Sequence, residues 1–308
     1  VSSTDALSGN SSDTEKNLMF IGTSNGGIPG TVYEFTSYAQ AKNVLRGGDL
    51  LAAIELAFNP SQESISAGTI YAVRVGNATQ ASYSNNGLTL LSQQYMAAAN
   101  RIQVLLRPNT LTNSHDLQVI FQDDNYSATY SNIGNLFSVT YDGSLAYASM
   151  EVDVDSATTG TGQATKLILK AGADKTSAVV AGSFDLGAGK YTTVGSLLSD
   201  VNNIDGFHAA YSVGFSKSGV LTQYMDALAE TALSKDTGVT VTSLGGDILN
   251  TVGQRDSQVT VSYDPKKGEP SDFPLTFLSG GTDGDIPTSW SDDIAALQTT
   301  PGFYIVPL

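Results

Sequence analysis

Cysteine is absent from the sequence, and only two of its 308 residues are histidine. The absence of cysteine excludes disulfides, thiolate metal ligands and cysteine nucleophiles. A Ser-His-Asp site needs a histidine, and neither His115 nor His208 lies in a recognisable nucleophile motif. We therefore interpret both histidines as ordinary surface or strand residues. The sequence predicts a protein that is not an enzyme, with no catalytic, cofactor-binding or metal-binding residues and no cofactor.

Long apolar runs and positive charge are also scarce. No stretch approaches the roughly 18 apolar residues of a membrane span. The first residues lack the basic and apolar regions of a signal peptide, so residues 1–16 are interpreted as a polar tail. Fifteen Lys and Arg stand against 30 Asp and Glu, a net charge of -15. This charge disfavours nucleic acid and anionic membranes as partners, and it favours solubility.

The stretch 47–75 carries the clearest structural signal. Asp49 is expected to cap a helix whose apolar residues recur every four positions, and Asn59-Pro60 is expected to end it. Residues 69–75, TIYAVRV, are apolar on both faces except at Arg74. This pattern predicts a strand inside a sheet that is covered by helices on both sides.

Other elements are predicted from the same kinds of pattern. A strand is expected at 18–21, and a helix at 38–45 with Ser37 and Gln40 as a capping box. Apolar periodicity predicts further helices at 194–204, 221–232 and 289–297. Short β-rich runs are expected at 88–92, 102–107, 117–122, 137–141, 147–154, 166–170, 179–184, 207–213, 239–244, 259–263, 273–278 and 303–308.

The distribution of these elements predicts the domain organisation. The regular spacing of β-rich runs between turns is typical of a compact β-barrel or sandwich. We predict an α+β/α/β fold, a helix-flanked mixed sheet domain interrupted by an inserted β-barrel-like domain, with hinges near 77–87 and 214–219. The predicted limits are 1–16 for the polar tail, 17–84 and 215–308 for the sheet domain, and 85–214 for the insert with one helix.

Two motifs suggest a binding site. The loop GTSNGGIPG at 22–30 suggests phosphate binding, but it lacks the Lys-Ser/Thr of a P-loop and the G-x-G-x-x-G spacing, so a surface turn is favoured. The second motif is an acidic cluster, and the specific functional hypothesis for it is calcium binding. An EF-hand loop would need a ligand oxygen where Pro287 stands and a glycine where Thr288 stands. The cluster comprises Asp283, Asp285, Asp292 and Asp293, the last two suited to the first turn of a helix.

Arg74 is the most unusual single residue, a cation in an otherwise buried strand. A local ion pair or a side chain that reaches solvent would explain it within one subunit. An intersubunit salt bridge is the functional alternative. The sequence leaves these alternatives open.

Several segments together resemble the core of phage contractile tail sheath proteins of the myovirus type. The resemblance is strongest to large phages of Gram-positive hosts, and it is collinear over nearly the whole chain. The matching segments are Phe35–Ser61, Gly68–Ser82, Gly87–Val104, Val119–Tyr141, Tyr263–Pro270 and Leu278–Trp290.

The resemblance implies a structural role. Such proteins stack as hexameric rings around a tail tube, and contraction drives the tube through the host envelope. Implied partners are other sheath subunits, the tube protein, the baseplate and the tail terminator. The implied location is the virion tail, after assembly in the host cytoplasm. The family's N-terminal arm and C-terminal domain have no counterpart here, so a fragment, monomeric by itself, is expected.

Other functions stay open at the level of sequence. The Ser/Thr/Gly/Asn-rich β insert also suits a surface adhesin or carbohydrate-binding module, which would need an aromatic-lined groove. An enzyme is the weakest alternative. A sheath from an injection machine without a capsid would have the same residues, and genomic neighbours would distinguish it.

Overall fold

The computed structural model describes residues 18–60, 67–155, 162–297 and 304–308, so the predicted polar tail lies outside the described residues. The chain divides into two compact units. Unit 1 comprises the described residues up to Ala81, with Gln94–Ala99 and Gly280–Leu308, and unit 2 comprises Ser82–Gln93 and Asn100–Ser279. Unit 2 is thus inserted into the sequence of unit 1. It extends to residue 279, beyond the predicted boundary at 214, because residues 215–279 pack with the insert.

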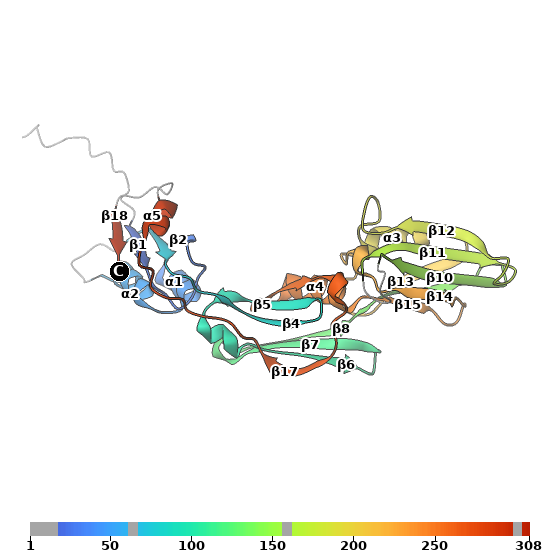
Figure 1. Cartoon of the computed structure of the whole chain (residues 1–308), viewed down its shortest axis with the longest axis horizontal. Helices are drawn as coiled ribbons and strands as arrows, with labels where there is room; N and C mark the ends of the chain where they lie inside the picture. Colours follow the sequence, from blue (N-terminus) through green and yellow to red (C-terminus); the bar gives the residue numbers. More distant parts are fainter. Residues whose placement is uncertain (1–17, 61–66, 156–161, 298–303) are drawn as a thin grey trace, which may run out of the picture. The chain divides into compact units, whose positions relative to one another are not determined.

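Unit 1 is built on a four-stranded mixed sheet in the order β18-β1-β3-β2 (Figure 1). β1 pairs in parallel with both β18 and β3, and β2 pairs antiparallel with β3. The strands are β1 Leu18–Gly22, β2 Val32–Phe35, β3 Ile70–Arg74 and β18 Tyr304–Pro307. The predicted strands at 18–21 and 69–75 are therefore confirmed as the two central strands of one sheet.

Both faces of this sheet are covered, as predicted for 69–75. Alternate residues such as Phe20 and Ala72 join the core under the helices α1 (Tyr38–Leu45) and α2 (Asp49–Phe58). Met19 and Val73 point to the other side, where Trp290 packs against them. α5 (Ser291–Leu297) lies against β3. The period-two alternation of strand side chains thus fills two cores from one strand.

The helix starts differ in detail from the predictions. Ser37 caps α1 by accepting from the Gln40 backbone N–H, while the Gln40 side chain accepts from the backbone of Thr36. The predicted cap Asp49 is instead the first residue of α2, and Gly48 holds the cap position with φ 90°. A Cβ there would lie 2.8 Å from a backbone atom of Ser24, so glycine fits this close approach.

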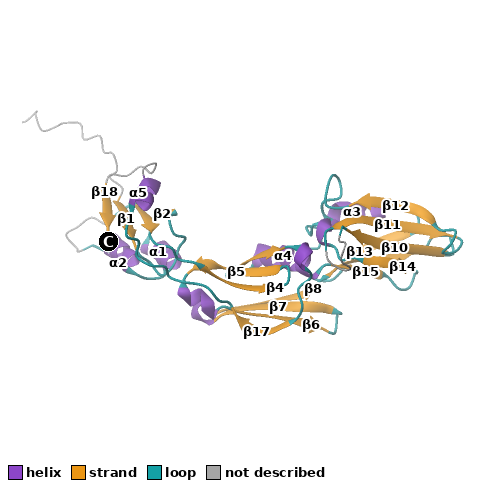
Figure 2. Cartoon of the chain, in the orientation of Figure 1, coloured by secondary structure: helices purple, strands orange, loops and turns teal. Residues whose placement is uncertain are grey.

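Unit 2 consists mainly of antiparallel strands (Figure 2). They form four sheets, in the orders β12-β11-β10-β14, β13-β9-β15, β16-β5-β4 and β17-β6-β7-β8. The first strands are β4 Gln80–Asn85, β5 Leu88–Tyr95, β6 Gln103–Asn109, β7 Ser114–Phe121, β8 Tyr126–Ile133, β9 Asn135–Tyr141 and β10 Tyr147–Val154. The others are β11 Ala164–Gly172, β12 Val179–Asp185, β13 Phe207–Tyr211, β14 Leu228–Ala232, β15 Val239–Thr242, β16 Val259–Tyr263 and β17 Phe273–Phe277.

Unit 2 is rich in strands, as expected, but none of its sheets closes on itself within the described residues. Two open sheets, that of β10 and that of β9, share one hydrophobic core with α3 (Val194–Val201). Phe137, Met150 and Leu197 are fully buried in it. The barrel prediction fails because regular strand spacing specifies hairpins, whereas closure depends on pairing between distant strands.

One helix predicted in unit 2 is wrong, and one helix that unit 2 contains was not predicted. Residues 221–232 form a short 3₁₀ turn, η3 (Thr222–Tyr224), and the strand β14, which pairs with β10. Pairing to a sheet there outweighs the helical period of the apolar residues. The unpredicted helix is α4 (Leu244–Arg255), which Ser243 caps by accepting from the Gly246 N–H.

Candidate functional site

Arg74, at the end of β3, is fully buried. Its Nη1 donates to the carbonyl oxygens of Gly27, at 2.8 Å, and Tyr95. Its Nη2 donates to the carbonyl oxygen of Asp283 at 2.8 Å. The acceptors lie in the loop after β1, at the end of β5 and in the segment after β17. One guanidinium therefore fastens three distant segments of unit 1 together, and we call this group the Arg74 clamp.

The electrostatics of the Arg74 clamp differ from those of an ion pair. Burial lowers the pKa of Arg74, and the charge of Asp283 opposes this effect. Arginine nevertheless stays protonated in proteins, so the guanidinium keeps its charge. The side chain is 0% exposed and is engaged inside its own unit, which contradicts the intersubunit salt bridge. The local explanation is right that Arg74 is bound within its own unit. It is wrong about the partner, because backbone carbonyl groups and not a carboxylate bind the cation.

The residues of the acidic cluster have separate partners and positions in the structure. Asp283 Oδ1 accepts from the Ala97 N–H at 2.9 Å, and the Asp285 N–H donates to Asn77 Oδ1 at 2.8 Å. Asp292 and Asp293 lie in the first turn of α5, as expected. Burial raises the pKa of Asp293, and the charge of Asp292 adds to this. Within the described ranges, no group of three or more His, Asp or Glu could hold a metal ion.

The histidines and the glycine-rich loop are placed in ordinary surroundings. His115, on β7, lies 3.4 Å from Asp272, and His208, on β13, lies 2.8 Å from Asp142. The loop at 22–30 is tied to β3 on both sides: the Gly27 carbonyl accepts from the Arg74 side chain, and the Gly30 N–H donates to the Arg74 carbonyl at 2.9 Å. This loop therefore contributes to the Arg74 clamp.

A second buried cation, Lys217, gave no signal in the sequence. Its Nζ donates to Asp247 Oδ2 on α4 and to the Asn132 carbonyl at 2.9 Å. The side chains of Lys217 and Asp247 are 1% and 0% exposed. Asp247 also accepts from the Gly134 N–H at 2.8 Å and from the Thr251 hydroxyl at 3.2 Å. Burial raises the pKa of Asp247, and Lys217 opposes that shift.

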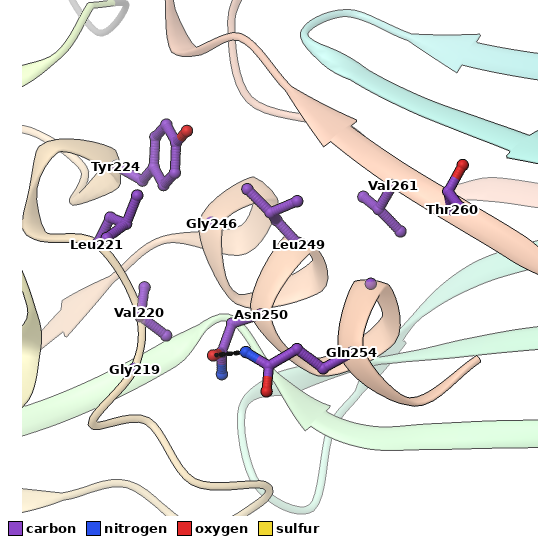
Figure 3. Close-up of a pocket in the computed structure, with 11 residues that line it drawn as sticks. Gly219, Val220, Leu221, Tyr224, Gly246, Leu249, Asn250, Gln254, Thr260 and Val261 are labelled. Atoms are coloured by element: carbon purple, nitrogen blue, oxygen red, sulfur yellow. Dashed lines mark hydrogen bonds between the residues drawn. The ribbon is translucent and has the colours of Figure 1, made fainter. Parts of the chain in front are cut away.

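A cavity of about 340 Å³ lies beside α4 in unit 2 (Figure 3). Tyr224 is the one titratable side chain in its lining, so it contains no acid–base pair. It is lined by Gly219, Val220, Leu221, Tyr224, Gly246, Leu249, Asn250, Gly253, Gln254, Thr260 and Val261.

None of the helices in the described part of the chain is long and apolar enough to cross a membrane.

No protein-family model matches the chain. The chain is 39% identical over 306 residues to a protein assigned to the tail sheath in Enterococcus phage phiEF24C, a match that covers 99% of the chain. It is 35% identical to the tail sheath protein of Staphylococcus phage Twort over 98% of its length, and 31% identical to that of Bacillus phage SP01 over 91%. The chain is a homologue of phage tail sheath proteins. The predicted resemblance to tail sheath proteins from phages of Gram-positive hosts is confirmed.

The chain spans about half the length of the curated relatives it matches, covering 52%, 54% and 48% of them in the same order. Among solved structures, it is similar to the sheath tail protein of Desulfitobacterium hafniense, at 12% identity and a TM-score of 0.38. That match covers 95% of the chain and 42% of the solved protein. The relatives are tail sheath proteins, so the role that the family suggests is that of a structural protein of the virion.

Proposed function

We propose that the chain is the middle and outer portion of a contractile tail sheath subunit. In this proposal, full-length subunits polymerise as stacked hexameric rings around the tail tube. Contraction of the sheath then drives the tube through the host cell envelope. The observation that carries the proposal is the identity of 31–39% to three tail sheath proteins over 91–99% of the chain.

The physical character of the two units supports this function. A sheath that contracts moves its subunits largely as rigid bodies between two packings, with the energy held at interfaces. Each unit has its own buried core, and each buries a cation that ties distant segments together. A unit with such a core can keep its fold while its contacts with neighbouring subunits change.

The partners follow from the same proposal. The subunit would bind other sheath subunits, the tail tube protein, the baseplate and the tail terminator, first in the host cytoplasm and then in the virion tail. A net charge of -15 suits a subunit that must stay dispersed before assembly. The same residues would serve an injection machine without a capsid, which genomic neighbours would distinguish.

The cavity beside α4 does not favour the adhesin alternative. A carbohydrate-binding groove would need several aromatic side chains, and the cavity beside α4 has Tyr224 as its one aromatic residue. We therefore do not propose it.

Electron microscopy of the full-length protein, produced together with its tube protein, tests the proposal. We expect tubes or stacked rings with six-fold symmetry around the tube. The tube protein alone is the control for structures that form without the sheath subunit. Samples in which the full-length protein stays monomeric beside assembled tube would overturn the proposal.

A further inference from the structure

The sheet β17-β6-β7-β8 of unit 2, drawn in Figure 2, has one buried face and one partly exposed face. Val104 and Val119, which lie opposite each other on β6 and β7, point to the buried face and are 0% exposed. The next pair, Leu105 and Gln118, points the other way and is half-buried. We call this second face the β17 face. It is defined here by Gln103, Leu105, Gln118, Ile120, Leu275 and Phe277.

An irregularity in β17 brings two large apolar side chains to the β17 face. Phe273 is buried, and strict alternation along the strand would place Leu275 and Phe277 on its side of the sheet. The register shifts between Phe273 and Thr276, as at a β-bulge, so that Phe277 lies opposite Gln103 instead. Leu275 and Phe277 are therefore 49% and 56% exposed.

Another sheet of unit 2 has an outer face of a different kind. On the sheet β12-β11-β10-β14, Lys170 pairs with Glu151 and Glu230 at 3.0 Å each, and Lys166 pairs with Asp185 at 3.5 Å. Such ion pairs suit a face that stays in water. All six residues that define the β17 face are uncharged. A centre without charges is typical of a surface that another protein covers.

The surroundings of the β17 face also favour a contact through the face. Arg107 pairs with Asp116 across β6 and β7 at 3.9 Å, and Arg101, just before β6, pairs with Asp123, just after β7. An apolar centre between charged ends matches the core and rim of protein interfaces. Pro274 of the edge strand β17 has no N–H to donate, which disfavours the addition of a further strand at this edge.

We propose that the β17 face is a docking surface for a second copy of this chain in the assembled sheath. The inference rests on the proposed function, which surrounds each subunit with other copies. Each copy has a net charge of -15, so copies repel one another, and this repulsion is weakest where a face carries no charge. Rings stacked along one tube relate the copies by rotation and translation, so the β17 face meets a different surface of its neighbour.

The size of the β17 face suits a contact that forms only within an assembly. With about 4.8 Å between strands and about 3.4 Å per residue, a four-stranded sheet covers roughly 300 Å² over the five residues of β17. A stable complex of two proteins buries about 800 Å² on each partner. One contact of this size is too weak to hold two isolated chains together, whereas many such contacts add up along a sheath.

Photo-crosslinking of the full-length protein, assembled around its tube protein, tests this surface. A photoreactive phenylalanine analogue is placed at position 277, and the products are separated by mass. We expect a product of two sheath subunits, at least about tenfold above its yield in the unassembled protein. The control carries the same analogue at position 168, where Ile168 lies opposite Glu151 on the charged face of β11. It should give less than about a tenth of this product.

The other outcomes separate this inference from the proposed function. A product that joins position 277 to the tube protein, or to another part of the same subunit, would overturn the choice of a second copy. Equal yields at positions 277 and 168 would overturn it as well, because random collisions would then explain the product. If the unmodified protein formed no sheath around the tube, the proposed function would fail and the second copy would fail with it. A sheath that forms without any crosslink at position 277 would overturn the docking surface alone.

Phe277→Asp provides a second measurement, because it places a charge in the centre of the β17 face. Phe277 is more than half exposed, so the Tm of the variant should stay within about 3 °C of the wild type. The yield of assembled sheath should fall at least about tenfold. Leu111→Asp, at a side chain 94% exposed in the turn between β6 and β7, is the control and should assemble like the wild type. Normal assembly of Phe277→Asp would contradict the docking surface.

Discussion

Unit 1 and unit 2 each bury a cation completely, and they stabilise it in different ways. Arg74 of unit 1 donates to three backbone carbonyl groups, so its hydrogen-bond partners are neutral dipoles and not charged groups. Lys217 of unit 2 pairs with a carboxylate, Asp247, and donates to one carbonyl. Both arrangements fasten distant chain segments, and the second also neutralises a charge within a core.

The difference reflects the chain segments that each cation joins. The Arg74 clamp holds the segments containing Tyr95 and Asp283, which precede and follow long stretches of unit 2 in the sequence. Backbone carbonyls are present in any such segment, and the planar guanidinium offers five N–H groups in fixed directions. The ammonium of Lys217 is a point charge and suits one close carboxylate.

The largest effect is expected for Lys217→Met. The substitution leaves Asp247 buried without its cation, which typically costs about 3–5 kcal/mol of unfolding free energy. Because the pKa of Asp247 is already raised, the cost should shrink as pH falls and the carboxyl becomes protonated. Chemical denaturation at two pH values measures both quantities.

Two further variants make this prediction specific. Lys217→Met with Asp247→Asn should recover much of the loss, because the Asn side chain is neutral and can still accept from Gly134. Lys190→Met, at a lysine 65% exposed and paired with Asp200, should cost less than about 1 kcal/mol. Equal losses at Lys217 and Lys190 would show that burial of the pair has no energetic consequence.

A smaller effect is expected for Arg74→Lys. The ammonium keeps the charge but lacks the guanidinium fork, so at least one of three carbonyl groups loses its donor at a cost of about 1–3 kcal/mol. The loss should appear as faster hydrogen exchange in residues 94–99 and 280–285. Arg101→Lys, at an exposed arginine paired with Asp123, is the matched control and should change neither. If exchange in both segments were unchanged by Arg74→Lys, the clamp would be disproved.

The smallest effect is expected at a helix cap of unit 2. Ser243→Ala removes the acceptor for the Gly246 N–H and should cost about 1 kcal/mol. Ser37→Ala, at the cap of α1 in unit 1, should cost less, because its 3.4 Å contact with Gln40 is longer and exposed. A larger loss at Ser37 than at Ser243 would reverse this order.

The sequence specified the local elements of unit 1 well. The helices at 38–45 and 49–58 have continuous apolar periodicity and clear ends, and 69–75 has the apolar pattern of a covered strand. The helix α4 was missed because Gly245, Gly246 and Gly253 lower its intrinsic helix propensity. Burial of Ile248 and Val252 stabilises it in the fold.

Distant contacts were the part that the sequence could not specify. Arg74 stood out as a buried cation, but its carbonyl partners at Gly27 and Asp283 lie 47 and 209 positions away. Carbonyl groups occur at every residue, so no side-chain pattern marks them. Lys217 and Asp247 look like ordinary surface charges until the fold brings them together.

The proposed function places this chain in the tail sheath. Immunogold electron microscopy of the phage particles, with antibodies raised against this chain, tests this location. We expect label along the whole length of the tail, on extended and on contracted particles. Label confined to the capsid or to the tip of the tail, with the shaft unlabelled, would contradict it.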